Sequence, residues 1–228
     1  MLVPAGRAGS VGGLPDCCDP AAYERFFDEK EAEKSVRAYR RKGLDPMAAS
    51  LVRYLKSRGV QGADVLEVGG GVGAIQIELL KGGARRSVNV ELSPSYEESA
   101  RHLAEENGLE GQITRRFGDF VEISADLDPA DIVVMNRVVC CYPFMERLVS
   151  AAAAKTGRYL AMVYPRDSWW VRLALRLQDL LGALRDDYVP AYVHPVEEIE
   201  EVATRDGLTV GHRRQGLMWL GVVVQRVA

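Results

Sequence analysis

A glycine cluster between an apolar run and a helix-like pattern constrains the fold of this chain most strongly. Residues 64–80 read DVLEVGGGVGAIQIELL. An apolar run of strand length precedes the glycines and apolar residues at helical spacing follow them, which predicts a buried parallel strand, a tight turn and a helix. Glycine permits positive φ and close approach of a ligand, and the helix N-terminus directs unpaired N–H groups to the same place. The stretch therefore predicts a ligand-binding turn.

Two classes of cofactor use such a turn. Gly69, Gly71 and Ala74 fit the dinucleotide pattern G-x-G-x-x-A, and Glu91 lies near the ~20-residue spacing expected of an acid that binds a ribose. This interpretation predicts an NAD(P)-dependent oxidoreductase. The alternative also explains Glu67, an acid in an apolar strand that is costly to bury without a cationic partner. The amino group of S-adenosylmethionine (SAM) would supply that cation, whereas a pyrophosphate would be repelled, so we favour SAM.

Length and charge exclude several classes of protein. The chain has 228 residues, which suits one α/β domain with an added segment, although two small domains would also fit. The net charge is −3 and the basic pairs are scattered among acids, so we expect no nucleic-acid partner. No stretch reaches the ~20 apolar residues of a membrane span, and no signal-peptide core is present. We therefore expect a soluble, cytoplasmic protein without stable membrane insertion, and the oligomeric state stays open.

The four cysteines form two adjacent pairs, at 17–18 and 140–141. Neighbouring residues on an extended chain point in opposite directions, and neither pair has the C-x-x-C spacing of a zinc site. We expect reduced thiols and no metal. A metal or metalloid site that joins the two pairs is the alternative.

The N-terminal part divides into two segments. Residues 1–16 are rich in Gly, Pro and Ala without periodicity, which predicts a disordered leader. Residues 17–58 carry apolar residues at helical spacing, and Asp45-Pro46 predicts the start of one helix. These helices either fill core or form a lid over the cofactor, with Tyr39 and Arg40 near its carboxylate. Residues 59–228 then form the cofactor-binding domain.

Strands and helices alternate through this domain. We expect further strands at 86–90, 112–117, 131–135 and 157–164, helices at 93–107, 143–155 and 196–206, and a terminal hairpin of 208–214 with 217–227. Ligands bind at the carboxyl ends of strands in doubly wound sheets. Glu91 is therefore expected to accept the ribose hydroxyls, Asp119 the adenine amine, and Phe120 to pack on the ring, while Asn136 to Tyr142 face the transferred methyl.

Residues 168–185 are unusually apolar for a helix. A helix with so broad an apolar surface is buried, covers an apolar ligand or touches a membrane. We favour burial.

Several of these motifs together resemble class I SAM-dependent methyltransferases. The resemblance rests on Glu67-x-Gly-x-Gly-x-Gly73, on Glu91 at the end of the second strand, on residues 118–120 after the third, and on the terminal hairpin, and it covers Leu55 to the C-terminus. It implies a doubly wound α/β fold: a mostly parallel, seven-stranded sheet with helices on both faces and an antiparallel last strand. It also implies SAM as cofactor and S-adenosylhomocysteine (SAH) as product.

One stretch is similar to the magnesium-protoporphyrin O-methyltransferase branch of this family. Residues 138–143, followed by Tyr164-Pro165, lie where that branch carries a His-Tyr-Pro. This chain has Cys141 in place of the histidine, a departure that puts methylation of a porphyrin carboxylate in doubt.

The expected site consists of a cofactor-binding set, an acceptor-binding set and a catalytic set. The cofactor-binding set is Tyr39, Arg40, Glu67, Gly69, Gly71, Gly73, Glu91, Leu92, Asp119, Phe120 and Asn136. Arg137, Cys141, Tyr164 and Arg166 are expected to bind the acceptor, because aromatic faces with cations favour a planar small molecule carrying an acidic group.

Catalysis by methyl transfer mainly requires alignment and exclusion of water. His194 is the best available base for an oxygen or nitrogen acceptor, and Tyr142 is expected to orient the acceptor or face the sulfonium. A protein of this fold that binds SAM without catalysis is the remaining alternative.

Overall fold

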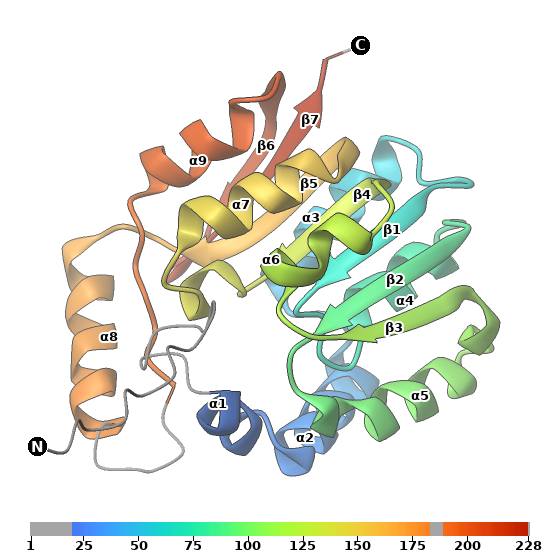
Figure 1. Cartoon of the computed structure of the whole chain (residues 1–228), viewed down its shortest axis with the longest axis horizontal. Helices are drawn as coiled ribbons and strands as arrows, with labels where there is room; N and C mark the ends of the chain where they lie inside the picture. Colours follow the sequence, from blue (N-terminus) through green and yellow to red (C-terminus); the bar gives the residue numbers. More distant parts are fainter. Residues whose placement is uncertain (1–19, 183–188, 228) are drawn as a thin grey trace, which may run out of the picture.

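A seven-stranded sheet forms the centre of the molecule (Figure 1). The computed structural model describes residues 20–182 and 189–227. The strand order is β3-β2-β1-β4-β5-β7-β6; β1 to β5 run parallel, and β7 is antiparallel to both β5 and β6. The strands are β1 Asp64–Val68, β2 Arg86–Glu91, β3 Ile113–Phe117, β4 Ala130–Asn136, β5 Thr156–Pro165, β6 Leu208–Gln215 and β7 Trp219–Arg226. This topology confirms the predicted fold class, including the antiparallel last strand and the terminal hairpin.

Helices cover both faces of this sheet, and others lie beyond the ends of its strands. The helices are α1 Pro20–Phe26, α2 Glu29–Lys42, α3 Pro46–Ser57, α4 Ala74–Lys81, α5 Glu97–Glu106, α6 Phe120–Ile123, α7 Met145–Ala154, α8 Trp169–Gly182 and α9 Val196–Thr204. Short 3-10 turns lie at η2 Pro94–Tyr96, η3 Glu110–Gln112, η4 Ser124–Asp126 and η5 Val139–Cys141.

The central strand β4 shows why its sequence is apolar throughout. Ile132 and Val134 belong to the core under α3, α4 and α5, whereas Val133 and Met135 belong to the core under α6, α7 and α9. Side chains alternate between the two faces of a strand, and a parallel sheet is covered on both faces. All four side chains are buried, so an unbroken apolar run is what this position requires.

The N-terminal helices have two different locations. The helix α3 begins at the predicted place, where Asp45 accepts hydrogen bonds from the N–H groups of Met47 and Ala48. Leu51 and Leu55 place it in the core of the sheet. The helices α1 and α2 instead lie at the carboxyl ends of the first strands (Figure 1). The predicted leader at 1–16 and the Cys17-Cys18 pair lie outside the described residues.

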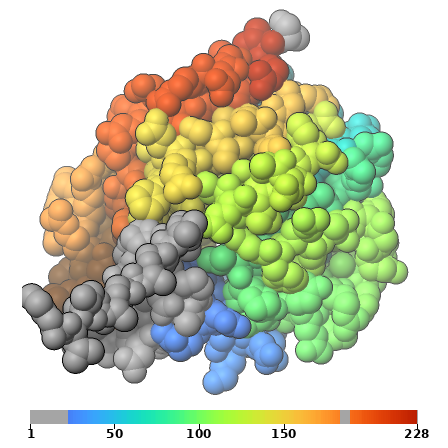
Figure 2. Space-filling model, viewed as in Figure 1, coloured from blue at the N-terminus to red at the C-terminus, as the bar shows by residue number. Residues whose placement is uncertain are grey.

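The apolar helix α8 corrects the interpretation that we favoured from the sequence. Val171 and Leu175 are buried, but Trp169 and Leu180 are 77% and 70% exposed. Figures 1 and 2 show α8 at the edge of the molecule, beyond the end of the sheet. Burial is therefore wrong for its outward face, because the helix does not lie on a face of the sheet. Within residues 20–182 and 189–227, no helix is long and apolar enough to cross a membrane.

Candidate functional site

A cavity of about 1600 Å³ opens at the carboxyl ends of the strands. One side, here called the strand-end wall, consists of residues 67–72, 74–75, 90–93, 118–120, 136–138 and 140–142. The opposite side, here called the helix wall, consists of parts of α1 and α2, the 43–45 turn, residues 174–182 and residues 189–191. Pockets for one small ligand are usually about 300–1,000 Å³. The cavity therefore has room for two molecules side by side.

The glycine turn has a conformation and a packing that exclude side chains. Gly69 and Gly71 have φ of 60° and 54°, in the left-handed region that glycine adopts without strain. A β-carbon at Gly69 would lie 2.6 Å from Val138, and one at Gly71 would lie 3.2 Å from Tyr96. Gly73, with φ of 77°, begins α4; unlike the other two, it does not line the cavity.

Glu67 lies buried beneath this turn. Its Oε2 accepts a hydrogen bond from the backbone N–H of Gln76 in α4, at 3.0 Å. Burial raises the pKa of Glu67 to about 8, while the Gln76 bond and the nearby Arg115 oppose the rise. We expected a cationic partner for this acid. The backbone N–H of Gln76 and protonation of the carboxyl group also stabilise Glu67 in its buried position. In this structure Glu67 ties β1 to α4 under the turn.

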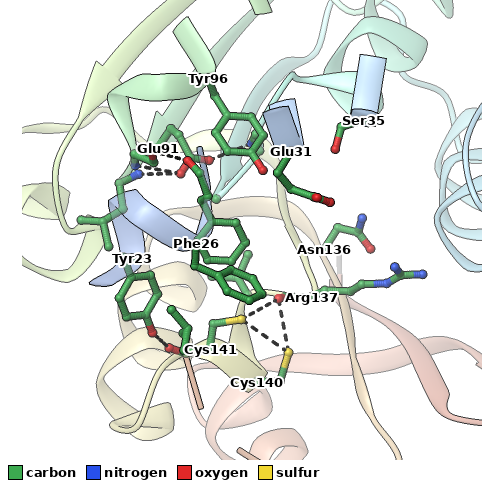
Figure 3. Close-up of a pocket in the computed structure, with 18 of the residues that line it drawn as sticks. Tyr23, Phe26, Glu31, Ser35, Glu91, Tyr96, Asn136, Arg137, Cys140 and Cys141 are labelled. Atoms are coloured by element: carbon green, nitrogen blue, oxygen red, sulfur yellow. Dashed lines mark hydrogen bonds between the residues drawn. The ribbon is translucent and has the colours of Figure 1, made fainter. Parts of the chain in front are cut away.

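Glu91 holds the turn from the second strand. Its Oε2 accepts from the N–H of Gly71 at 2.8 Å, and its Oε1 accepts from the N–H groups of Leu92 and Ser93 at 2.8 and 3.1 Å (Figure 3). A carboxylate has about four lone-pair sites, so Glu91 can accept one further donor. Glu91 and Leu92 both line the cavity, as expected from the sequence.

Arg115 is a support of the turn that sequence reasoning missed. Its Nη1 donates to the carbonyl of Gly71 at 3.2 Å, and its Nε donates to Glu97 at 2.6 Å. The peptide groups of Gly71 are thus held both at the N–H and at the C=O. A basic residue in a strand was the available signal, but it does not say which loop the side chain reaches.

Asp119 and Tyr142 form a hydrogen-bonded pair in the same wall. Asp119 caps α6 through the N–H of Val121 at 2.8 Å, and its Oδ2 accepts from the Tyr142 hydroxyl at 2.9 Å. Burial, and then the bond to Asp119, raise the pKa of Tyr142 above its ordinary value. The phenol therefore stays protonated and acts as a donor. Phe120 also lines the cavity.

Asn136 ends β4 and Arg137 follows it, and both line the cavity (Figure 3). The Oδ1 of Asn136 is buried without a hydrogen-bond partner in the described structure. Arg137 has φ of 61°, unusual for a residue with a side chain. Its guanidinium lies 4.6 Å from the centre of the Trp219 ring, with Nη2 3.4 Å from Asp45. The strand end thus offers a free acceptor and a cation.

Two residues expected near the cofactor carboxylate have other partners. Tyr39 lines the cavity, but its hydroxyl donates to Glu78 of α4 at 2.8 Å. Arg40 pairs with Glu106 and does not line the cavity. Adjacent helical residues point in different directions, so a pair chosen by position alone is separated in space.

Two residues expected at the acceptor also lie outside the cavity lining. Tyr164 is buried in the core between the sheet and α6, α7 and α9, and its hydroxyl lies 3.5 Å from Glu200. Arg166 donates to the carbonyl of Gly216 at 3.2 Å in the terminal hairpin. An unbroken apolar strand does not indicate which residues face which side, and this explains the placement of Tyr164 in β5. Arg166 follows β5, and its hydrogen bonds to the hairpin decide its direction.

His194 is not among the cavity-lining residues either. A ring nitrogen lies 2.9 Å from the carbonyl oxygen of Tyr142, and the ring stacks on Tyr192. Burial lowers the pKa of His194, although the backbone bonds oppose this. The geometry therefore gives its expected role as a base no support, and that role stays a prediction.

Comparison with known proteins now identifies the family. Residues 37–212 match a family model described as a methyltransferase domain. The chain belongs to this methyltransferase family. Membership decides against the oxidoreductase and confirms the prediction of a class I SAM-dependent methyltransferase.

Solved structures of this fold include methyltransferases with different bound molecules. Magnesium protoporphyrin IX methyltransferase from Synechocystis PCC 6803 with bound SAH gives a TM-score of 0.72 at 19% identity, covering 92% of this chain and 100% of that one. An O-methyltransferase family 2 protein from Planctomyces limnophilus in complex with apigenin gives 0.58 at 18% identity, covering 82% and 63%. At these identities the likeness shows the shared fold.

Curated relatives match over a shorter part. The ribosomal protein L11 methyltransferase of Edwardsiella ictaluri is 32% identical over 94 residues, which is 41% of this chain and 31% of that protein. The match thus spans about a third of the relative's length.

Proposed function

We propose that the cavity binds SAM along the strand-end wall and transfers its methyl group to a small acceptor held against the helix wall. The observation that carries the proposal is Arg137. This cation lies in the cavity at the end of β4, and the helix wall across the cavity carries apolar side chains from α1 and α8 and charged side chains mainly from α2. SAM, when bound, supplies a methyl group on a positively charged sulfur.

The strand-end wall fits this cofactor in its donors and acceptors. Glu91 has one carboxylate lone pair left for a ribose hydroxyl, and Asp119 has two left for an adenine amine, with Phe120 also lining the cavity. The unpaired Oδ1 of Asn136 is a buried acceptor that a donor of the cofactor would satisfy. The close approach permitted by Gly69 and Gly71 provides the space.

The helix wall favours an acceptor with an apolar body. Its side chains include Phe26, Phe27, Leu177, Leu181 and Val189. An acidic group on the acceptor would pair with Arg137, which can form a bidentate bond to a carboxylate. The acceptor class that fits best is a planar or partly apolar small molecule with an acidic group, methylated on oxygen or nitrogen.

The residues of this chain contribute mainly positioning. Tyr142 is protonated and bound to Asp119, so it orients a neighbour and does not accept a proton. Arg137 fixes the acid of the acceptor, and the apolar side chains of α1 and α8 exclude water from the transfer. An acceptor that enters as an anion needs no base.

A cofactor titration is the first test. We expect SAH to bind the wild type in isothermal titration calorimetry and Glu91→Ala to weaken binding at least tenfold, because bonds to a charged acceptor contribute about 1.5–3 kcal/mol. Glu98→Ala, an exposed acid on α5, is the matched control. Equal affinity in all three proteins would place the cofactor elsewhere.

A transfer assay is the second test. Tritiated SAM is supplied with planar aromatic carboxylates in one arm and with ribosomal protein L11 in the other. The second arm is included because the relatives that match part of this chain are named ribosomal protein L11 methyltransferases. Label in the small-molecule arm supports the proposal. Label in the protein arm alone would overturn it and assign a protein acceptor.

A further inference from the structure

Cys140 and Cys141 converge although they are neighbours in sequence. They lie in the 3-10 turn η5 after β4, and their sulfur atoms are 3.9 Å apart. Both sulfurs also face the carbonyl oxygen of Arg137, at 3.3 and 3.6 Å (Figure 3). Adjacent side chains point in opposite directions on an extended chain. These two cysteines lie in a turn, so their side chains can point the same way.

The two thiols are located where the walls of the cavity meet. Both line it, and Cys141 packs against a small apolar cluster that contains Tyr23 and Val189. The Tyr23 hydroxyl of α1 donates to the carbonyl of Cys141, and the Tyr192 N–H donates to the carbonyl of Cys140 at 2.7 Å. A ligand on these sulfurs would therefore sit between the strand end and the segments that cover it.

The ligand set is a pair of sulfurs. Among the described residues, no group of three or more His, Cys, Asp or Glu side chains could hold a metal ion. Closed zinc sites use four ligands, so zinc does not fit. A monosubstituted trivalent arsenical needs two sulfurs, because its third bond is already made to carbon. The Cys140 hydrogen bond lowers the pKa of Cys141, which favours the nucleophilic thiolate there.

We propose that Cys140 and Cys141 form a dithiol site that binds monosubstituted trivalent arsenicals through both sulfurs. With phenylarsine oxide, two As–S bonds form and the two S–H protons leave with the arsenic-bound oxygen as one water. Arsenic stays trivalent and no redox partner is required. A rotation of either side chain closes the remaining distance between the sulfurs.

The test uses the full chain with Cys17→Ser and Cys18→Ser, which leaves Cys140 and Cys141 as its only cysteines. After reduction and desalting, phenylarsine oxide is added and the intact mass is measured, before and after a wash with excess 2-mercaptoethanol. We expect one adduct per chain that survives this monothiol and is released by 2,3-dimercaptopropanol. Cys140→Ser and Cys141→Ser should each lose the resistant adduct and bind at least tenfold more weakly, and thermal unfolding checks their fold.

A second measurement requires no further substitution. In the same background, phenylarsine oxide should protect two thiols from iodoacetamide, whereas monodentate binding protects one. Protection of one thiol or none would overturn the proposal, as would a resistant adduct in either single variant. Neither readout involves methyl transfer, so the result is independent of the proposed enzymatic function.

Discussion

The two walls of the cavity are built in opposite ways. On the strand-end wall Glu91 accepts three backbone N–H groups, and Arg115 and Glu91 hold Gly71 from both sides. On the helix wall Leu177 and Leu181 are more than half exposed and have no polar atoms to fix. Hydrogen bonds preorganise the first wall, whereas apolar contacts allow the second to adapt. A change in the hydrogen-bonded glycine turn should therefore act on cofactor affinity, whereas a change at Arg137, which follows β4 in the same wall, should act on the acceptor alone.

The largest effect is expected from Gly71→Val. A branched β-carbon at positive φ is strained and would lie 3.2 Å from Tyr96, so SAH affinity should fall at least 100-fold in calorimetry. Gly108→Val is the control, because Gly108 has φ of 65° with nothing within 4 Å of the added carbon. Both variants should lose stability, but only the first should lose SAH. Equal loss of SAH in both would show that strain, and not the cavity, is responsible.

Next in size is Arg137→Ala. Loss of a charge-assisted bond of about 1.5–3 kcal/mol should raise the acceptor KM roughly tenfold or more, with SAH affinity unchanged, in steady-state kinetics. Arg166→Ala is the matched control, since that guanidinium binds the hairpin carbonyls. This expectation replaces the acceptor role assigned to Arg166 from sequence. A higher KM for Arg166→Ala alone would restore that role.

The pH dependence of stability should reveal Glu67. Its folded pKa of about 8 lies above the ordinary value of 4.5, so the folded state holds a proton that the unfolded state has lost. The wild type should therefore lose stability as pH rises from about 4.5 to 8, whereas Glu67→Gln should not.

In thermal unfolding, the Tm of Glu67→Gln relative to that of the wild type should rise across this pH window. The rise should be roughly 2–4 °C for each kcal/mol of unfolding free energy that the wild type loses. Glu122→Gln, at an exposed position on α6, should show no such trend. A constant difference for Glu67→Gln would mean that Glu67 is ionised throughout the window.

The smallest effect is expected from His194→Ala. Because His194 contacts the Tyr142 carbonyl and does not line the cavity, kcat should change no more than about twofold, an effect of a few tenths of a kcal/mol. A tenfold or larger fall in kcat, with a fully folded protein, would reinstate His194 as the base.

Local sequence determined much of the strand-end wall of the cavity. Glu67, Gly69 and Gly71 lie within five residues on one strand and turn, and Glu91 ends the next strand, which pairs with the first in parallel. The helix start at Asp45-Pro46 is local in the same sense. Strand period, glycine conformation and capping act within a few residues, which is why these features could be predicted.

Tertiary structure alone decided the other side. The sequence shows how many apolar side chains α8 carries, but it does not show which of them pack against other segments. Among the described residues, nothing covers the outward face of α8. It could not assign Tyr164 to a sheet face, bring Arg115 to Gly71 or turn two adjacent cysteines toward each other. Each of these depends on contacts between segments far apart in the chain or on a turn within it, and the residue pattern at one position does not encode them.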